Sequence, residues 1–318
     1  MSDLTRKDFL KAVGAAAAGL AVFGPAGCGG AKTVVSAPTR PAGPSALNAG
    51  DAYLAAAHGP DPATITEKAM EAIGGMKRFV RKGDDVIVKP NICVDYHSPE
   101  YAATTNPTVV AALVSLCLAA GAGRVRVMDM PFGGTPESAY AKSGIGPAVE
   151  AAGGVMEVMS PVRYATYRIP RGRSISSWPV YRDVLETDVL IDVPIAKVHD
   201  LAGLTLGGKN LLGVIQDPGG IHMNIGQRVA DLISLVRPNL TVVDAVRILL
   251  RNGPTGGDLA DVKQTDTVIA SHDIVAADAF AATLFGQTGA DVSYVVAAHA
   301  MGLGEIDLKK LKIRVIEA

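Results

Sequence analysis

A short apolar run closed by a proline, Asp84-Asp85-Val86-Ile87-Val88-Lys89-Pro90, predicts a buried strand of a parallel sheet. A second run of the same kind, Val189-Leu190-Ile191-Asp192-Val193, stops at Pro194. Further strands are predicted over residues 124–128, 240–243 and 267–270. Amphipathic helices are predicted over residues 107–120 and 229–236, and a further helix over residues 274–285. This alternation predicts an α/β fold in which a largely parallel sheet carries helices on both faces, in one large domain or in two lobes.

The composition is that of a folded protein with balanced charge. Among 318 residues, 30 Lys and Arg stand against 31 Asp and Glu, so the chain lacks the basic surplus of a nucleic-acid-binding protein. A hydrophobic content of 48% with 19% charged residues excludes intrinsic disorder for most of the chain. Three cysteines cannot by themselves supply the four thiolates of an iron–sulfur or zinc site, so no iron–sulfur cluster is expected.

The first 28 residues have the pattern of an export signal. A basic region, Thr5-Arg6-Lys7-Asp8-Phe9-Leu10-Lys11, precedes an apolar stretch that is too short to span a bilayer. It resembles a twin-arginine signal in which Lys7 replaces the second arginine. The segment Pro25-Ala26-Gly27-Cys28 resembles a lipoprotein box, which implies acyl chains on Cys28 that hold the protein at a membrane face. The expected partners are then the twin-arginine export machinery and a membrane, and the expected location is periplasmic or at the cell surface; the alternative is cleavage nearby, with Cys28 lost or free.

The next segment, residues 29–61, is rich in Pro, Ala, Gly and Ser and shows no sustained periodicity. Such a composition predicts a tether. The sequence therefore predicts three parts: an export signal over residues 1–28, a tether over residues 29–61 and an α/β domain over residues 62–318.

Polar side chains follow the predicted strands at the points where these strands end. They are Lys89, Asn91, Asp129, Lys197, His199 and Asp244. Ligands of open α/β sheets bind at the carboxyl ends of the strands, so we expect these side chains to share one site. No Gly-x-Gly-x-x-Gly pattern follows the first strand, which leaves a dinucleotide site with little support.

The loop over residues 194–213 carries the densest group of candidate binding residues. They are Lys197, His199, Gly207, Gly208, Lys209 and Asn210. Backbone N–H groups of glycines can approach a ligand closely, and lysine ammonium groups complement anionic oxygens. His199 can exchange a proton near neutral pH, and a desolvated lysine can become a nucleophile. The alternative is an ordinary glycine turn with solvated lysines.

Two carboxylates and a second histidine complete the candidate site. Asp129 and Asp244 each end a strand, where a carboxylate can transfer a proton, bind a metal or pair with a lysine. With His199 as an acid or base, they form the predicted catalytic group. His222 is a candidate metal ligand beside His199, although two histidines alone make a weak metal pattern.

Several segments, which follow one another along the chain, resemble the bacterial and archaeal family called domain of unknown function 362. The resemblance covers residues 84–313 and is most specific at Lys197-Val198-His199 and at Gly208-Lys209-Asn210-Leu211-Leu212-Gly213. It also includes Val88-Lys89-Pro90-Asn91 and Asn252-Gly253-Pro254-Thr255-Gly256-Gly257. The activity of the family is unsettled, so the resemblance implies no particular reaction. Some members carry an added ferredoxin-like region, and this chain lacks its cysteines, which again implies no iron–sulfur cluster.

A shorter stretch is similar to the nickel-pincer lactate racemase group, in which a His, an Ala-Gly pair, a Gly-Gly pair and a Lys share one loop. Here His199, Ala202-Gly203, Gly207-Gly208 and Lys209 follow in that order. The similarity implies His199 as an acid or base and Lys209 as the covalent anchor of a nickel-pincer-like cofactor. The chain departs from the group where its Gly-Gly pair directly abuts Lys209.

These patterns together favour an exported, membrane-anchored protein that binds an anionic small molecule or cofactor. The ligand's charge would be met by a group of cationic and amide side chains, namely Lys89, Lys197, Lys209 and Asn210. If the chain is an enzyme, the expected chemistry is proton transfer or redox chemistry around His199. The alternative is a non-catalytic solute-binding or assembly lipoprotein, and a fold alone does not decide between the two.

Overall fold

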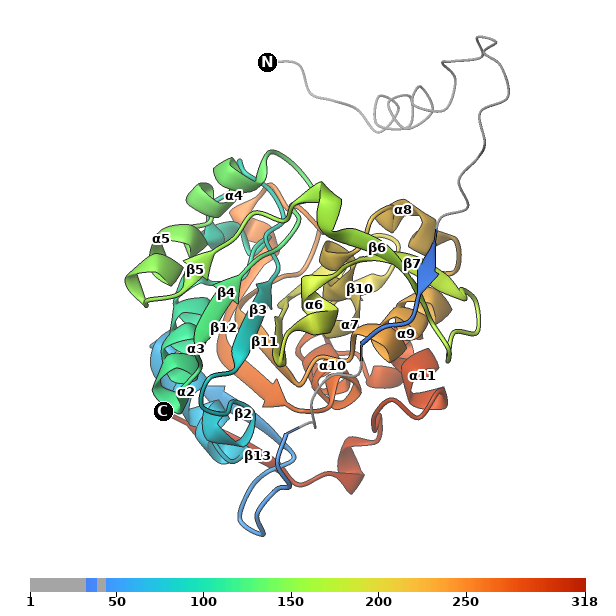
Figure 1. Ribbon diagram of the computed structural model, residues 1–318. Coiled ribbons are helices and arrows are strands. Elements are labelled where there is room, and N and C mark those ends of the chain that lie inside the picture. The colour runs from blue at the N-terminus through green and yellow to red at the C-terminus, as the bar shows by residue number, and fades with distance from the viewer. Residues whose placement is uncertain (1–32, 39–43) are drawn as a thin grey trace, which may run out of the picture. The chain divides into compact units, whose positions relative to one another are not determined.

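The computed structural model describes residues 33–38 and 44–318 (Figure 1). The predicted export signal and its lipidation candidate, Cys28, lie outside these residues.

The main sheet has ten strands in the described part of the chain. They are β2 (Leu54–His58), β3 (Asp85–Pro90), β4 (Arg124–Val127), β5 (Val155–Met156), β8 (Val189–Val193), β9 (Ile195–His199), β10 (Gly203–Thr205), β11 (Leu240–Leu249), β12 (Val262–Ser271) and β13 (Ile313–Glu317). Their order is β13-β2-β12-β11-β8-β3-β4-β5, with β9 paired to β11 and β10 to β9. The strands from β11 to β5 in this order are mutually parallel, whereas β12 runs antiparallel to both of its neighbours. The prediction of a largely parallel sheet is therefore confirmed, and the run at residues 267–270 belongs to the antiparallel strand.

Helices occupy the connections between these strands. Those in the described residues are α2 (Pro62–Ala72), α3 (Pro107–Ala120), α4 (Pro136–Lys142), α5 (Ile145–Ala151), α6 (Asp183–Glu186), α7 (Gly207–Asn210), α8 (Pro218–Ile221), α9 (Ile225–Val236), α10 (Ile274–Ala282) and α11 (Ser293–Ala300). The predicted helices are confirmed as α3, α9 and α10. Asn106 caps α3, because its side chain accepts the N–H of Thr108, and Pro107 takes the first helical position. None of these helices has the length and apolar character that crossing a bilayer requires.

The helices cover both faces of the sheet, because successive side chains of a strand point to opposite sides. In β3, Val86 and Val88 pack into a core with α2, α3 and α5, which we call the α3 face. Ile87 packs into a second core with α9, α10 and α11, which we call the α10 face. Figure 1 shows these two groups of helices on either side of the central strands. The prediction of helices on both faces is confirmed.

A smaller sheet of three strands accompanies the main one. It consists of β1 (Val34–Val35), β6 (Tyr164–Arg168) and β7 (Ser177–Tyr181). It does not form a lobe of its own, because the chain from Val34 to Ala318 makes a single compact unit. Of the two arrangements that the sequence allowed, the structure has one domain.

The segment predicted as a tether contains a strand of the main sheet. β2 lies between β12 and β13, and its residues Leu54 to Ala57 are fully buried. The run Leu-Ala-Ala-Ala shows no periodicity because both of its faces are covered, so its composition resembles that of a low-complexity linker. The folded domain therefore begins before Leu54, and the predicted boundary at residue 62 is corrected.

This boundary predicts different outcomes for two truncated chains. A chain that begins at residue 44 keeps β2 and is expected to unfold cooperatively. A chain that begins at residue 62 loses a buried strand that lies between two others. We expect the free energy lost with this strand to exceed the total stability of a domain, which is roughly 5–15 kcal/mol, so no cooperative transition should remain. Thermal unfolding followed by circular dichroism measures this. Equal melting curves for the two chains would contradict the corrected boundary.

Candidate functional site

Two ionisable side chains lie opposite each other on the α10 face of the sheet. Lys89 follows Ile87 by two residues in β3, and Asp192 follows Leu190 by two residues in β8, so both point to the face where Ile87 and Leu190 pack. The strand register pairs Lys89 with Asp192 directly. Both side chains are fully buried. A buried ammonium group requires acceptors on all sides, and these acceptors define the site.

The Lys89 ammonium is surrounded by three acceptors. It lies 2.7 Å from Asp129 Oδ1 and donates to the carbonyl oxygen of Pro90 at 2.8 Å and to Asn210 Oδ1 at 3.0 Å. Burial raises the pKa of Asp129, and the charge of Lys89 opposes that shift. Asp129 Oδ2 also accepts the backbone N–H of Ile92 at 2.7 Å, so this carboxylate acts as the counter-charge of Lys89.

Two asparagines connect Lys89 to a second buried lysine. The Lys197 ammonium donates to Asn91 Oδ1 at 3.0 Å and to the carbonyl oxygen of Ala103 at 2.6 Å. Asn91 Nδ2 in turn donates to Asn210 Oδ1 at 2.9 Å. Five of the predicted site residues are thus brought into one hydrogen-bonded network: Lys89, Asn91, Asp129, Lys197 and Asn210.

Asp192 joins this network and was not predicted as a site residue. Its Oδ1 accepts Nδ2 of Asn210 at 2.8 Å, while Oδ2 is buried and has no hydrogen-bond partner among the described residues. Burial raises its pKa well above the usual range and so favours the neutral carboxyl group. The signal was present in the sequence, since an aspartate inside an apolar strand is a buried polar group. We call Asp192, Lys209 and the five residues above the lysine cluster.

Lys209 differs from the other two lysines of the cluster. It is only 9% exposed, yet its ammonium forms no hydrogen bond or ion pair with the part of the chain that the structure describes. Burial is the main cause that lowers its pKa to about 8, and the positive charges of Lys197 and Lys89 lower it further. The Lys209 side chain is therefore largely buried, while its ammonium group has no acceptor in the described chain.

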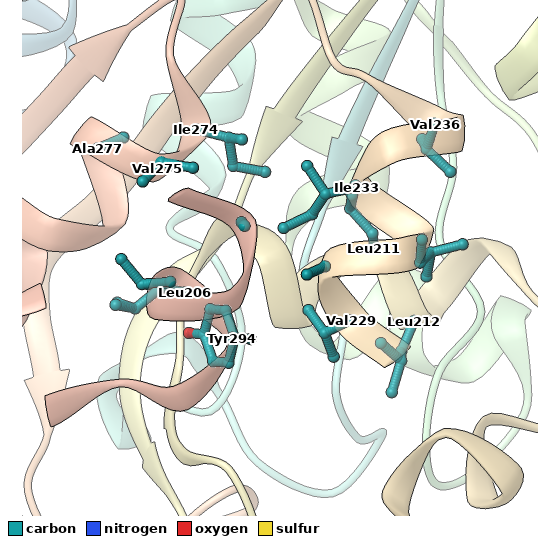
Figure 2. Close-up of a cluster of buried hydrophobic side chains, with 14 of the residues drawn as sticks. Leu206, Leu211, Leu212, Val229, Ile233, Val236, Ile274, Val275, Ala277 and Tyr294 are labelled. Carbon is teal, nitrogen blue, oxygen red and sulfur yellow. The ribbon is translucent and has the colours of Figure 1, made fainter. Parts of the chain in front are cut away.

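The helix that carries Lys209 is held in place by apolar packing and by one aspartate. Figure 2 shows Leu206 and Leu211, which flank α7, in a cluster with Ile233 of α9, Ile274 of α10 and Tyr294 of α11. The backbone N–H groups of the two glycines donate to the carboxyl oxygens of Asp278 in α10 at 2.7 and 2.8 Å.

These contacts correct the predicted role of Gly207 and Gly208. Their N–H groups were expected to face a ligand, and they face Asp278 instead. A Cβ atom at Gly207 would lie 2.9 Å from Asp278 Oδ1, and one at Gly208 would lie 2.9 Å from Ile233 Cδ1. Both glycines are needed so that α7 can pack closely against α9 and α10. Burial raises the pKa of Asp278 to about 7.

His199 ends β9 and is a neutral imidazole. Burial is the main cause that lowers its pKa to about 3, and the charge of Lys209 contributes. Its Nδ1 accepts the N–H groups of Leu201 and Ala202 at 3.1 and 3.3 Å, so the proton of the neutral ring is on Nε2. His199 can thus donate a hydrogen bond to a ligand through Nε2.

His222 lies near His199, with 6.0 Å between the ring centroids. Burial and the charge of Lys209 lower its pKa, and its Nε2 has no hydrogen-bond partner among the described residues. The same residues contain no group of three or more His, Cys, Asp or Glu side chains that could hold a metal ion. The two imidazoles therefore form a pair without the further ligands that a metal site requires.

Asp244 does not join the lysine cluster. It follows Leu240 and Val242 at even spacing in β11, and both of these residues pack on the α3 face. Its carboxylate accepts the N–H of Asn106 at 2.7 Å and that of Val246 at 3.0 Å, so it supports the start of α3. Burial raises its pKa to about 6. The prediction that Asp244 shares the site with the lysines is wrong, because the strand turns it to the other face.

Cys93 is a neighbour of the lysines that the sequence patterns did not single out. It lies two residues beyond Asn91, in the loop after β3, and is buried. Its Sγ donates to the carbonyl oxygen of Pro254 at 3.7 Å. A hydrogen bond with Cys93 also opposes the burial that lowers the pKa of Lys197. The turn over residues 252–257 therefore packs over this end of the cluster.

A cavity of about 240 Å³ lies elsewhere in the fold and contains none of the predicted site residues. Its lining includes Arg171, Arg237, His272 and Ile274. Arg237 precedes β11 and His272 follows the antiparallel β12, so the cavity is at the opposite edge of the sheet from Lys89. We place the candidate site at the lysine cluster, because it is there that ionisable groups with shifted pKa values converge.

Comparisons with known proteins identify a family and a relative for this chain. The model of a family described as "Domain of unknown function (DUF362)" matches residues 86–283. A thylakoid-associated protein of Synechocystis is 28% identical over 245 residues, which cover 74% of this chain and 73% of that protein.

Two solved structures show weaker similarity. The lactate racemase apoprotein of Thermoanaerobacterium thermosaccharolyticum has a TM-score of 0.43 at 15% identity, over 68% of this chain and 53% of that one. A protein of Thermotoga maritima has the same TM-score and identity, over 73% of this chain and 60% of its own. The chain thus spans little more than half of either structure, and their activities are not carried over to it.

The missing partner of Lys209 predicts an unusual effect on stability. The unfolded chain holds the Lys209 proton up to ~pH 10.4 and the folded chain only up to about pH 8, so the free energy of unfolding rises with pH between these values. Lys209→Met removes this cost, and we expect it to stabilise the protein by about 2 kcal/mol at neutral pH and by less near pH 10. Urea unfolding at both pH values measures the difference.

The matched control is Lys309→Met, since Lys309 is exposed. We expect this change to stay within about 0.5 kcal/mol of the wild type at both pH values. A Lys209→Met variant that is less stable than the wild type at neutral pH would show that the ammonium has an internal partner after all.

Proposed function

This chain belongs to the DUF362 family, and from its lysine cluster we propose that it binds an anionic small molecule at Lys209. The observation that carries the proposal is a lysine side chain that is only 9% exposed and whose ammonium group has no acceptor among the described residues. Burying an unpaired charge is costly, and a bound anion removes that cost.

The charges of the cluster support an anion rather than a cation or a neutral ligand. Lys89 is balanced by Asp129, whereas Lys197 donates to the neutral oxygens of Asn91 and Ala103 and has no ion pair with a carboxylate of the described chain. Asp192 favours its neutral form, and Lys209 has no counter-charge in the described chain. The cluster therefore holds more ammonium groups than carboxylates in a region from which water is largely excluded.

The roles within the site follow from what each side chain already binds. Four side chains are hydrogen-bonded to one another, namely Lys89, Asn91, Lys197 and Asn210. They position the site, and the two lysines supply its positive charge. Lys209 meets the anion, and Nε2 of His199 offers it a hydrogen bond. His199 therefore acts as a hydrogen-bond donor, and Asp129 is held by Lys89 and by the N–H of Ile92.

Thermal unfolding in the presence of small anions tests this proposal. We expect inorganic phosphate, acetate or glyoxylate, compared with chloride at constant ionic strength, to raise the Tm of the wild type, because an anion at ~100 times its Kd adds about 2.7 kcal/mol. The shift should vanish in Lys209→Met and persist in Lys309→Met. Equal shifts in the two variants, or no shift with any of the three anions, would refute the proposal.

We further propose that the protein is exported and held at a membrane by acyl chains on Cys28. Support comes from the basic and apolar segments before Cys28 and from the lipoprotein-like box around it. The Synechocystis relative is described as thylakoid-associated, which favours membrane association for this chain as well.

The anchor predicts a change of location in one variant. Cys28→Ser is expected to move the protein from the membrane fraction to the soluble fraction, because the acyl chains have no other attachment point in this proposal. Cys117→Ser is the matched control, since Cys117 is buried in the core of the α3 face. Immunoblots of separated fractions measure the distribution. Cys28→Ser protein that stays in the membrane fraction would rule out lipidation as the anchor.

A further inference from the structure

Lys209 has the properties that an amine needs in order to act as a nucleophile. An attacking amine must be free of acceptors, held in a fixed place and present in part without its proton. The Lys209 ammonium has no hydrogen bond or ion pair with the described residues. Its helix is fixed by the two bonds to Asp278 and by the apolar cluster in Figure 2. Its pKa of about 8 leaves a substantial neutral fraction near physiological pH.

The other two lysines cannot take this role. Lys89 is held by Asp129, Pro90 and Asn210, and its side chain is fully buried. Lys197 is held by Asn91 and Ala103. Their charges act on Lys209 from fixed positions and so favour its neutral form. A neighbouring cationic group is one known means of activating a lysine toward a carbonyl group, and burial of the lysine is another.

We propose that Lys209 forms an imine with a carbonyl group of its anionic ligand, so that the ligands are small oxo acids or anionic aldehydes. This inference rests on the proposed anion site and deepens it. The hydrogen-bonded ammonium groups of Lys89 and Lys197 attract the carboxylate of such a ligand. The same charges favour the neutral, reactive form of the Lys209 amine. A ligand that carries both a carboxylate and a carbonyl group would thus match both the ammonium groups and the neutral amine of the cluster.

The chemical step is balanced without an oxidant or reductant. The Nζ lone pair of neutral Lys209 attacks the carbonyl carbon, a C–N bond forms as the C=O π bond opens, and one of the two nitrogen protons passes to the oxygen. The resulting carbinolamine then loses its hydroxyl group and the remaining nitrogen proton as water, which leaves a C=N bond. Nε2–H of His199 is available to donate a hydrogen bond to the departing oxygen.

Reductive trapping tests the inference on the full chain. The protein is incubated near neutral pH with glyoxylate and sodium cyanoborohydride, which converts an imine into a stable carboxymethyl-lysine, and the modified residues are mapped by peptide mass spectrometry. Glyoxylate is chosen because Lys209 is only 9% exposed and a small probe is required. We expect Lys209 to be modified at least about tenfold faster than the exposed Lys309, since the neutral fraction of an amine rises about tenfold for each unit by which its pKa is lowered, while burial of Lys209 slows the approach of the probe.

Lys209→Arg is the matched variant, because it keeps the positive charge but cannot form an imine. We expect this variant to lose the adduct while still being stabilised by phosphate. The wild-type peptide map decides the question even if the variant does not fold. Modification at Lys209 no faster than at Lys309 overturns the imine. If anions nevertheless raise the Tm of the wild type, the anion site stands without it, and if they do not, both proposals fall.

Discussion

Burial of two lysine ammonium groups is the constraint on which this structure depends. Lys89 and Lys197 are at most 1% exposed, and an ammonium group inside a protein is tolerated only when acceptors surround it. The acceptors come from widely separated parts of the chain: Asp129 follows β4, Asn91 follows β3 and Asn210 ends α7. Satisfying the two charges therefore draws three connections of the sheet together at one edge.

A buried cation outside the candidate site, Arg126, is paired with carboxylates, unlike Lys209. Arg126 is 5% exposed, and its guanidinium group lies 2.6 Å from carboxylate oxygens of both Asp85 and Asp183. Lys209 is almost as well buried, and the described chain gives it no carboxylate at all. Since leaving a buried charge unpaired costs free energy, the absence of a partner is a feature that a structural role does not explain. Functional sites commonly retain such unfavourable features, because the ligand supplies the missing interaction.

Close packing accounts for the remaining part of the site. α7 is one turn long and would not be stable alone, so its position comes from its surroundings. Asp278 binds the first two N–H groups of the turn, and the apolar side chains on either side of it pack between α9, α10 and α11 (Figure 2). These neighbours leave no room for a Cβ atom at Gly207 or Gly208. The glycine pair thus serves to bring Lys209 into the core.

Local sequence patterns were sufficient to determine the α/β class, the central strands, the helices α3, α9 and α10, and the edge at which polar residues gather. Each of these depends on the spacing of apolar residues along one short segment, which the sequence displays directly. β2 was not predicted because a run of small residues that is covered on both sides has no period in its hydrophobicity.

Only the tertiary structure decided which of the polar residues meet. Asn210 reaches Lys89 across 121 positions and Gly207 reaches Asp278 across 71, while the alternation along β11 turns Asp244 away to α3. Whether a buried group has a partner depends on such long-range contacts, so the unpaired state of Lys209 became visible only once the chain was folded.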